Sequence, residues 1–151
     1  MLLRFTKAPP AAPADTLVCT RANGTAVTVD LPKQGILPPA AFHYVITTTL
    51  GWPDTYFGQL TAPRTSAKKP RADAAPPRQS AALAECLAAE QWGGATDPAA
   101  FAAKLATACR RQRVPPPVLA PADLARLRAA VREFGAAWRP LNPGQSLERT
   151  L

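Results

Sequence analysis

Histidine and cysteine are scarce in this sequence, which has one histidine and three cysteines among its 151 residues. The cysteines, Cys19, Cys86 and Cys109, are odd in number and widely separated, a pattern typical of reduced thiols in a cytosol rather than of a disulfide framework. Structural zinc sites take their ligands in close pairs, and the sequence has no such pair. We therefore expect no metal and no cofactor. We also expect Cys19 and Cys109, which fall on predicted core faces, to act as small apolar residues.

Long apolar runs are also missing. A helix that crosses a bilayer needs about 20 consecutive apolar residues, and no stretch of the sequence approaches that length. A signal peptide needs an apolar run of about 7–15 residues after a basic end, whereas Leu2 and Leu3 are followed at once by Arg4. These absences predict a cytoplasmic protein that has no membrane partner.

Acidic residues are fewer than basic ones, with 10 Asp and Glu against 18 Lys and Arg and a formal net charge of +8. Such a charge permits binding to nucleic acid or to an acidic surface. The abundance of alanine, proline and arginine is also typical of a GC-rich bacterial genome, whose codon bias raises the arginine content without selection for a polyanion. Phosphate-binding glycine motifs are absent, because Gly93 and Gly94 form a lone pair of the kind that ends a helix. Charge alone therefore does not identify a partner.

The strongest local signal lies in residues 16–31, where an Asn-Gly pair separates two β-branched, alternating runs. This pattern predicts a β-hairpin. A three-residue loop with Gly24 in the left-handed conformation pairs Cys19 with Val27. Because a one-residue slip would turn every side chain to the other face, burial selects this register. The apolar face that it gathers consists of Leu17, Cys19, Val27, Val29 and Leu31.

Helical periodicity accounts for most of the remaining sequence. Proline suits the first turn of a helix and glycine its C-terminal cap, and apolar residues spaced three or four apart indicate a buried stripe. By these criteria we expect helices over residues 38–50, 54–60, 80–91, 96–111 and 121–139. Alternation over residues 2–7 and 145–151 adds an N-terminal and a C-terminal strand to the hairpin. The sequence thus predicts an α+β fold, in which a small, mainly antiparallel sheet packs against about four to five helices.

One segment breaks this pattern. Residues 61–79 consist mainly of Pro, Ala, Ser, Lys and Arg and contain no large apolar residue. A segment of this composition buries too little apolar surface to offset the entropy lost on ordering. We therefore expect residues 61–79 to form a disordered basic linker within a single domain that spans residues 1–151.

His43, the single histidine, lies on the apolar helix expected over residues 38–50. Its charge changes near neutral pH, so it is a candidate general base or metal ligand. A catalytic histidine needs a third group that orients it, and the positions one turn away, Pro39 and Thr47, supply no acid. We therefore weigh a functional histidine against one that is hydrogen-bonded locally at the flank of a helix. The candidate polar site consists of His43, Tyr44, Thr47 and Asp54.

Arginines gather near the end of the helix that begins at Thr96, at positions Arg110, Arg111 and Arg113. They are candidate phosphate contacts of a nucleic-acid-binding surface. Cations are also favourable at the C-terminus of a helix, and the basic stretches contain no interleaved aromatic residues and no recognisable reader motif. Nucleic-acid binding is therefore a weaker hypothesis than binding to a protein.

The helix around His43 carries motifs that resemble those of a family of uncharacterised bacterial proteins. That family has a helix P-H-D-L-x-H-Y-x-V-E, then L-G-[LW], an aromatic-aromatic-Gly step and a C-terminal strand P-G-x-x-L-E-[LR]-x-[FL]. The matching segments here are residues 38–47, 50–51, 56–58 and 143–151. The resemblance implies a polar site on this helix in the family, of which His43 and Tyr44 carry over. Its other polar residues are replaced here by Pro39, Ala40 and Thr47, which implies that this member lacks any metal or catalytic site that the family has.

These observations favour a non-catalytic binding or accessory domain of a bacterial cytoplasmic protein, with a protein as its partner. One alternative is a degenerate metal-dependent or hydrolase-like enzyme centred on His43, which requires a pocket there and a nearby carboxylate such as that of Asp54. A second alternative is a nucleic-acid-binding protein, which requires a basic strip on the folded surface. The surroundings of His43 and the distribution of the arginines separate these hypotheses.

Overall fold

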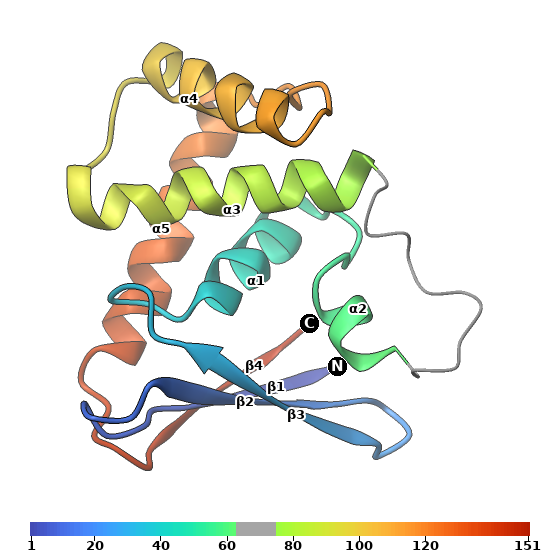
Figure 1. Ribbon diagram of the computed structural model, residues 1–151, viewed down its shortest axis with the longest axis vertical. Helices are drawn as coiled ribbons and strands as arrows, with labels where there is room; N and C mark the ends of the chain where they lie inside the picture. Colours follow the sequence, from blue (N-terminus) through green and yellow to red (C-terminus); the bar gives the residue numbers. More distant parts are fainter. Residues whose placement is uncertain (63–74) are drawn as a thin grey trace.

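The computed structural model describes residues 1–62 and 75–151, and these form an α+β fold, as the sequence predicts (Figure 1). Its elements are β1 (Leu2–Thr6), β2 (Ala14–Thr20), β3 (Ala26–Pro32), α1 (Pro39–Leu50), α2 (Phe57–Thr61), α3 (Ala75–Gly93), α4 (Pro98–Arg111), α5 (Pro121–Trp138) and β4 (Ser146–Thr150). The strands make one antiparallel sheet, and the helices pack in layers on one of its faces. α1 lies near the sheet, α3 forms the next layer and α4 the outermost one, while α5 runs from α4 down to the sheet.

The hairpin of β2 and β3 has the predicted register. Cys19 pairs with Val27, and Leu17 pairs with Val29. Gly24 is left-handed, with φ at +82°, a conformation that costs a residue with a side chain about 1–2 kcal/mol. Leu17 and Cys19 are consequently fully buried. The three-residue loop therefore sets which face of the sheet meets the helices.

The first and last strands lie side by side, and the last strand, β4, forms one edge of the sheet. The strand order is β3-β2-β1-β4, so the C-terminal strand returns to pair with β1, as predicted. Leu3 and Phe5 alternate into the core and are fully buried. The ring of Phe5 meets Phe134 of α5 edge to face, with 5.3 Å between centroids. On the opposite face of the sheet, Arg4 forms an ion pair with Glu148.

α1 packs against both α3 and α5 and occupies the centre of the helical layers. It ends at Gly51, which is left-handed with φ at +66°, as its predicted role as C-terminal cap requires. The predicted stripe is buried at its centre, whereas Thr49 and Leu50 at its end are only half-buried. The buried residues of α1 are Ala40, Ala41, Phe42, Val45 and Ile46.

The start of α3 corrects a boundary prediction. We expected this helix to begin at Ser80, but it begins at Ala75 and Ser80 is buried. Tertiary contacts hold the early start: Arg78 Nη1 donates to the carbonyl of Gln112 at 3.2 Å, and Gln79 Nε2 donates to the carbonyl of Pro115 at 2.8 Å. Residues 75–79, expected to belong to a disordered linker, are therefore helical.

At the other end of the expected linker, Thr61 is the last residue of α2. Its side chain is buried, and its Oγ1 donates to the carbonyl of Phe57 at 2.8 Å. Residues 63–74, the middle of the expected linker, lie outside the residues that the structure describes.

Two other helix starts differ from the predictions. α4 is capped by Asp97 rather than Thr96, because Asp97 Oδ1 accepts from the N–H of Ala100 at 2.9 Å. α2 begins at Phe57 rather than Asp54, and Asp54 Oδ1 accepts from the N–H of Phe57 at 2.8 Å. In both places a carboxylate satisfies an N–H group that the first turn leaves unpaired. α4 therefore starts two residues later, and α2 three residues later, than the sequence predicted.

Candidate functional site

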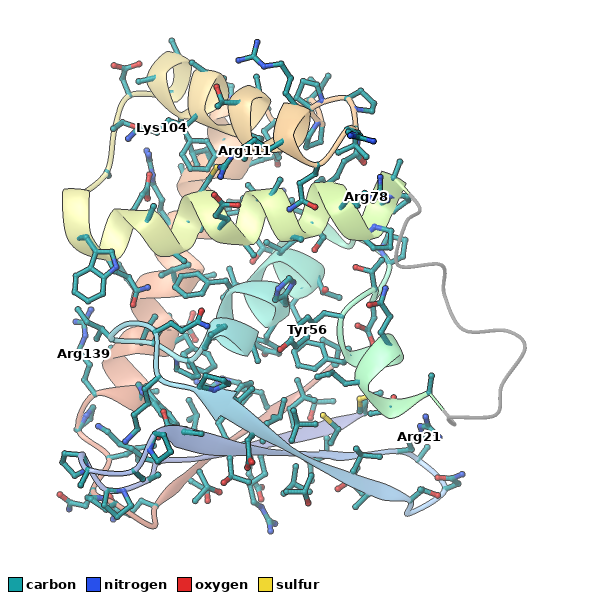
Figure 2. All side chains as sticks on the ribbon, in the orientation of Figure 1. Arg21, Tyr56, Arg78, Lys104, Arg111 and Arg139 are labelled. Carbon is teal, nitrogen blue, oxygen red and sulfur yellow. The ribbon has the colours of Figure 1, made fainter. Side chains whose placement is uncertain are left out.

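His43 projects from α1 and stacks on Tyr56, which lies in the segment before α2. The two rings are nearly parallel, with an interplanar angle of 6° and 4.0 Å between centroids. Tyr56 in turn meets Phe57 edge to face, at 5.0 Å. Figure 2 shows Tyr56 between α1 and α2. The stack thus joins α1 to the short helix that follows it.

Burial controls the protonation of His43. Desolvation lowers the pKa of its imidazole to about 4, because a buried site disfavours the charged form. The imidazole is therefore neutral at pH 7. Its Nδ1 is buried and has no hydrogen-bond partner among the described residues, and the same holds for Nε2 of the nearby Gln59. The sequence had left a local hydrogen bond as the ordinary interpretation of His43, and the structure gives Nδ1 none.

A pocket of about 240 Å³ opens beside His43, between α1, α2 and the start of α3. Tyr56, Gln59 and Arg78 contribute its aromatic, amide and cationic groups. The remaining lining residues are Thr55, Pro77, Ala81 and Gln112. The pocket therefore places several hydrogen-bonding side chains around the stacked rings.

The other members of the candidate polar site form no hydrogen bond with the His43 ring among the described residues. Tyr44 packs toward α5, with its ring 6.2 Å from that of Phe134. Thr47 is half-buried one turn further along α1. Asp54 is engaged with the backbone at the start of α2. Within residues 1–62 and 75–151, no hydrogen bond or ion pair links the imidazole to a carboxylate.

The cysteines are free and buried. Cys19 and Cys109 are both 0 % exposed, which confirms their predicted place in the core. Burial raises the pKa of the Cys19 and Cys86 thiols to about 11. Both thiols are therefore protonated at neutral pH, and the protonated form is a poor nucleophile.

The three arginines at the end of α4 are all exposed. Arg110 Nη2 donates to Thr107 Oγ1 at 3.1 Å, and Arg111 forms an ion pair with Glu85 of α3. Arg113 lies just past the helix with φ at +57°. The three residues thus lie at the end of α4, where two of the side chains already bind neighbours within the fold. Figure 2 labels Arg111, between α3 and α4.

A second surface was missed at the sequence level. Trp92 is 70 % exposed and Ile36 is 48 % exposed. Ile36 lines a groove of about 280 Å³ between the loop before α1, α3 and α5, and Leu37 and Gln91 line both this groove and an adjoining hollow that Trp92 lines. We call this surface the Trp92 face. Its residues are Ile36, Leu37, Leu87, Gln91, Trp92, Val131, Arg132 and Arg139.

Gln91 fixes the loop that forms the middle of the Trp92 face. Its Oε1 accepts from the N–H of Leu37 at 2.9 Å, while its Nε2 donates to the carbonyl of Ala88 at 3.0 Å. A Cβ atom at Gly35 would lie only 3.0 Å from Gln91 Nε2. The loop therefore packs closely on the Gln91 amide of α3, and a side chain at position 35 would press against that amide.

Arginines line the rim of the groove. Arg128 binds Glu90 through two hydrogen-bonding nitrogens and also donates to the carbonyl of Thr96, so the charge of Glu90 is compensated. The side chains of Arg132 and Arg139 have no ion pair among the described residues. Figure 2 shows Arg139 near the loop that leads into α1. Three arginines and one glutamate line the groove, so its lining carries a local charge of +2.

The only sequence signal for this face was the position of Trp92. Leu83 and Leu87 continue one buried stripe of α3, and Trp92 follows Leu87 by five residues, which places it off that stripe. A large aromatic residue off the buried stripe of a helix indicates an exposed apolar side chain. Trp92, Ile36 and Arg132 come from three segments that are far apart in the sequence. The sequence therefore does not show that they share one surface.

Comparison with known proteins gave no relative: no protein-family model, no curated protein and no solved structure matched this sequence. The resemblance to the uncharacterised bacterial family thus stays a prediction. Among the described residues, no three His, Cys, Asp or Glu side chains gather closely enough to hold a metal ion. No helix in the same part of the chain has the length and apolarity needed to cross a bilayer.

Proposed function

We propose that this chain is a non-catalytic binding domain of the bacterial cytoplasm and that it docks a protein partner on the Trp92 face. The observation that carries the proposal is the exposure of Trp92, at 70 %, beside an arginine-lined groove. Tryptophan and arginine are the residues most enriched among those that dominate binding energy at protein interfaces. Their concentration here supports an interface.

Apolar burial provides the attraction. Covering a large apolar side chain contributes about 1.5–3 kcal/mol, and Trp92 and Ile36 are both left uncovered by the fold. Because Gln91 already holds the loop around Leu37 in place, little ordering entropy remains to be lost when a partner binds. The face is therefore preorganised for association.

Charge complementarity indicates the chemistry of the partner. Arg132 and Arg139 are the uncompensated charges at the rim, while Leu37, Leu87 and Val131 supply apolar lining. An amphipathic segment with large apolar residues on one face and carboxylates at its edges fits this arrangement. We therefore assign an acidic amphipathic segment of another protein as the occupant.

Titration with synthetic peptides tests this proposal. One peptide carries a leucine face flanked by glutamates, and its counterpart has glutamine at every glutamate position. Binding is followed by calorimetry and by protection of tryptophan fluorescence from acrylamide, to which Trp92 is the most accessible tryptophan. We expect the acidic peptide to bind and the glutamine peptide to bind at least about 10-fold more weakly, since a lost charge pair at an interface is worth 1.4 kcal/mol or more.

Variants locate the binding surface. Trp92→Ser and the double change Arg132→Glu with Arg139→Glu should each weaken binding by more than about 10-fold. The double change Arg110→Glu with Arg113→Glu, which alters the charge by the same amount at exposed positions near the end of α4, serves as the control and should have little effect. Equal binding by Trp92→Ser and the unchanged protein would reject the Trp92 face. Tighter binding of single-stranded DNA than of the acidic peptide, with loss on the double change at Arg110 and Arg113, would favour the nucleic-acid hypothesis instead.

A further inference from the structure

The pocket beside His43 is lined by polar side chains that the proposed docking on the Trp92 face does not involve. It contains two buried polar atoms without partners among the described residues, His43 Nδ1 and Gln59 Nε2. Leaving a buried polar group unpaired destabilises the folded chain. Such groups are rare in native proteins and call for an explanation. Two of them in the lining of a single pocket are most simply explained by a ligand that pairs with them.

The lining selects the charge of that ligand. Gln59 Nε2 is a hydrogen-bond donor, and Arg78 contributes a guanidinium group. Arg78 uses one nitrogen on the carbonyl of Gln112, which leaves donors for a second acceptor. No aspartate or glutamate lines the pocket in the part of the chain that the structure describes. Several donors and one cation without a neighbouring acid favour an anion.

The same lining limits the size and polarity of the ligand. The pocket holds about 240 Å³, and the ring of Tyr56 forms part of its wall together with Pro77 and Ala81. A doubly charged anion would meet only one cation here, and it would have to lose most of its hydration against these apolar groups. A singly charged carboxylate on an apolar body matches both parts of the lining.

We propose that this pocket binds a small organic monocarboxylate. Arg78 and Gln59 donate to its oxygens, His43 donates through Nδ1 in the tautomer that carries the proton there, and the apolar body lies against Tyr56. Because His43 Nδ1 and Gln59 Nε2 are both covered in this structure, binding requires the Gln59 amide to turn toward the ligand and the groups that cover His43 Nδ1 to move aside. Glutamine has enough rotatable bonds for this movement.

The single histidine supplies a direct readout, since its ring proton gives one histidine signal in an NMR spectrum of the whole chain. We would titrate the protein with benzoate and, as the matched neutral control, with benzamide. Benzoate should shift the His43 resonance saturably, and benzamide should bind at least about 10-fold more weakly, because charge-assisted hydrogen bonds are the stronger ones. Absence of a saturable shift with benzoate, acetate and propionate up to tens of millimolar would overturn the proposal.

Titration with inorganic phosphate distinguishes an organic carboxylate from an inorganic anion as the ligand of this pocket. Binding of phosphate as tight as that of benzoate would reject an organic carboxylate as the ligand, because the apolar wall would then contribute nothing. We expect phosphate to compete poorly.

Substitutions in the lining test whether the shift of the His43 resonance reports binding in this pocket. Arg78→Gln should weaken benzoate binding by at least about 10-fold, whereas Arg110→Gln, with the same loss of charge outside the pocket, should leave it unchanged. Since Arg78 also anchors the start of α3, Gln59→Ala provides a second test that spares that contact. Trp92→Ser should bind benzoate normally, so failure at this pocket and failure at the Trp92 face are separable. Unchanged binding by both Arg78→Gln and Gln59→Ala would reject the assignment.

Discussion

The imidazole of His43 lies parallel to the ring of Tyr56, with 4.0 Å between their centroids. This contact places a neutral, buried histidine at the junction of α1 with the segment that precedes α2. It also removes one ring face of the histidine from solvent, so the proton chemistry of His43 depends on folding.

Stability should fall as the pH decreases through the titration range of His43. Its pKa is about 4 in the folded chain, below the ordinary value of 6.5. The unfolded chain therefore binds more protons between these values, and the stabilisation present above pH 6.5 is lost toward pH 4. The part lost between pH 7 and pH 5 is on the order of 2 kcal/mol. Urea unfolding at pH 7 and pH 5 measures it.

His43→Phe is the matched control for this effect, because phenylalanine keeps an aromatic ring against Tyr56 and does not titrate. Its unfolding free energy should change less between pH 7 and pH 5 than that of the unchanged protein. The same pH dependence in both proteins would mean that carboxylates, and not His43, are responsible.

Gly135→Ala should stabilise the protein. Gly135 is buried in the last turn of α5, where glycine is less favourable than alanine by up to about 1 kcal/mol. An added Cβ would lie 3.4 Å from the mobile end of Arg139 and 3.7 Å from Leu37, so the methyl group fits with a small shift of the arginine. A rise of a few degrees in the midpoint of thermal unfolding is expected, and a fall would show that the helix packs more tightly here.

Gly35→Ala should have the opposite effect. Its Cβ would lie 3.0 Å from Gln91 Nε2 and 3.2 Å from Gln91 Oε1, so the Gln91 amide must shift by a few tenths of an ångström and its hydrogen bond to Leu37 is weakened. The expected cost is about 1 kcal/mol or more. Denaturant unfolding measures the cost, and binding of the acidic peptide should weaken in parallel. If Gly35→Ala keeps both its stability and its peptide binding, Gln91 does not hold the loop around Leu37 in place.

Arg113→Gly should increase stability modestly. Arg113 is left-handed, with φ at +57°, and the N–H of Val114 donates to the carbonyl of Cys109 at 3.0 Å, which closes the end of α4. Glycine is the preferred residue at such a position, so the gain should be up to about 1 kcal/mol. Arg113→Ala, which removes the side chain but keeps the strain, is the control and should give no comparable gain in thermal stability.

Local sequence patterns determined much of the fold. Asn-Gly between β-branched runs specified the hairpin, and the burial of Leu17 and Cys19 selected its register, as observed. Gly51 ended α1, and alternation in the last residues predicted the strand that pairs with β1. These features depend on residues close in sequence or on the two-residue and 3.6-residue periods of strands and helices, which a sequence displays directly.

Tertiary contacts decided the start of α3. Residues 75–79 have the composition of a linker, yet Arg78 and Gln79 bind carbonyl groups of the segment after α4. Those carbonyls lie 34 and 36 residues further along the chain. Composition reports how much apolar surface a segment can bury, but it does not report a hydrogen-bond partner at that distance.

The candidate sites depended still more on the tertiary structure. From the sequence we grouped His43 with Tyr44 and Asp54, but these two contact the ring of Phe134 and the backbone of Phe57 instead. The actual neighbours of His43, Tyr56 and Gln59, belong to the segment that folds back beside α1. The sequence determined which segments are helices and strands because that choice is made by near neighbours. Only the packing of those elements decided which polar groups are buried together, because that choice depends on contacts between residues that are far apart along the chain.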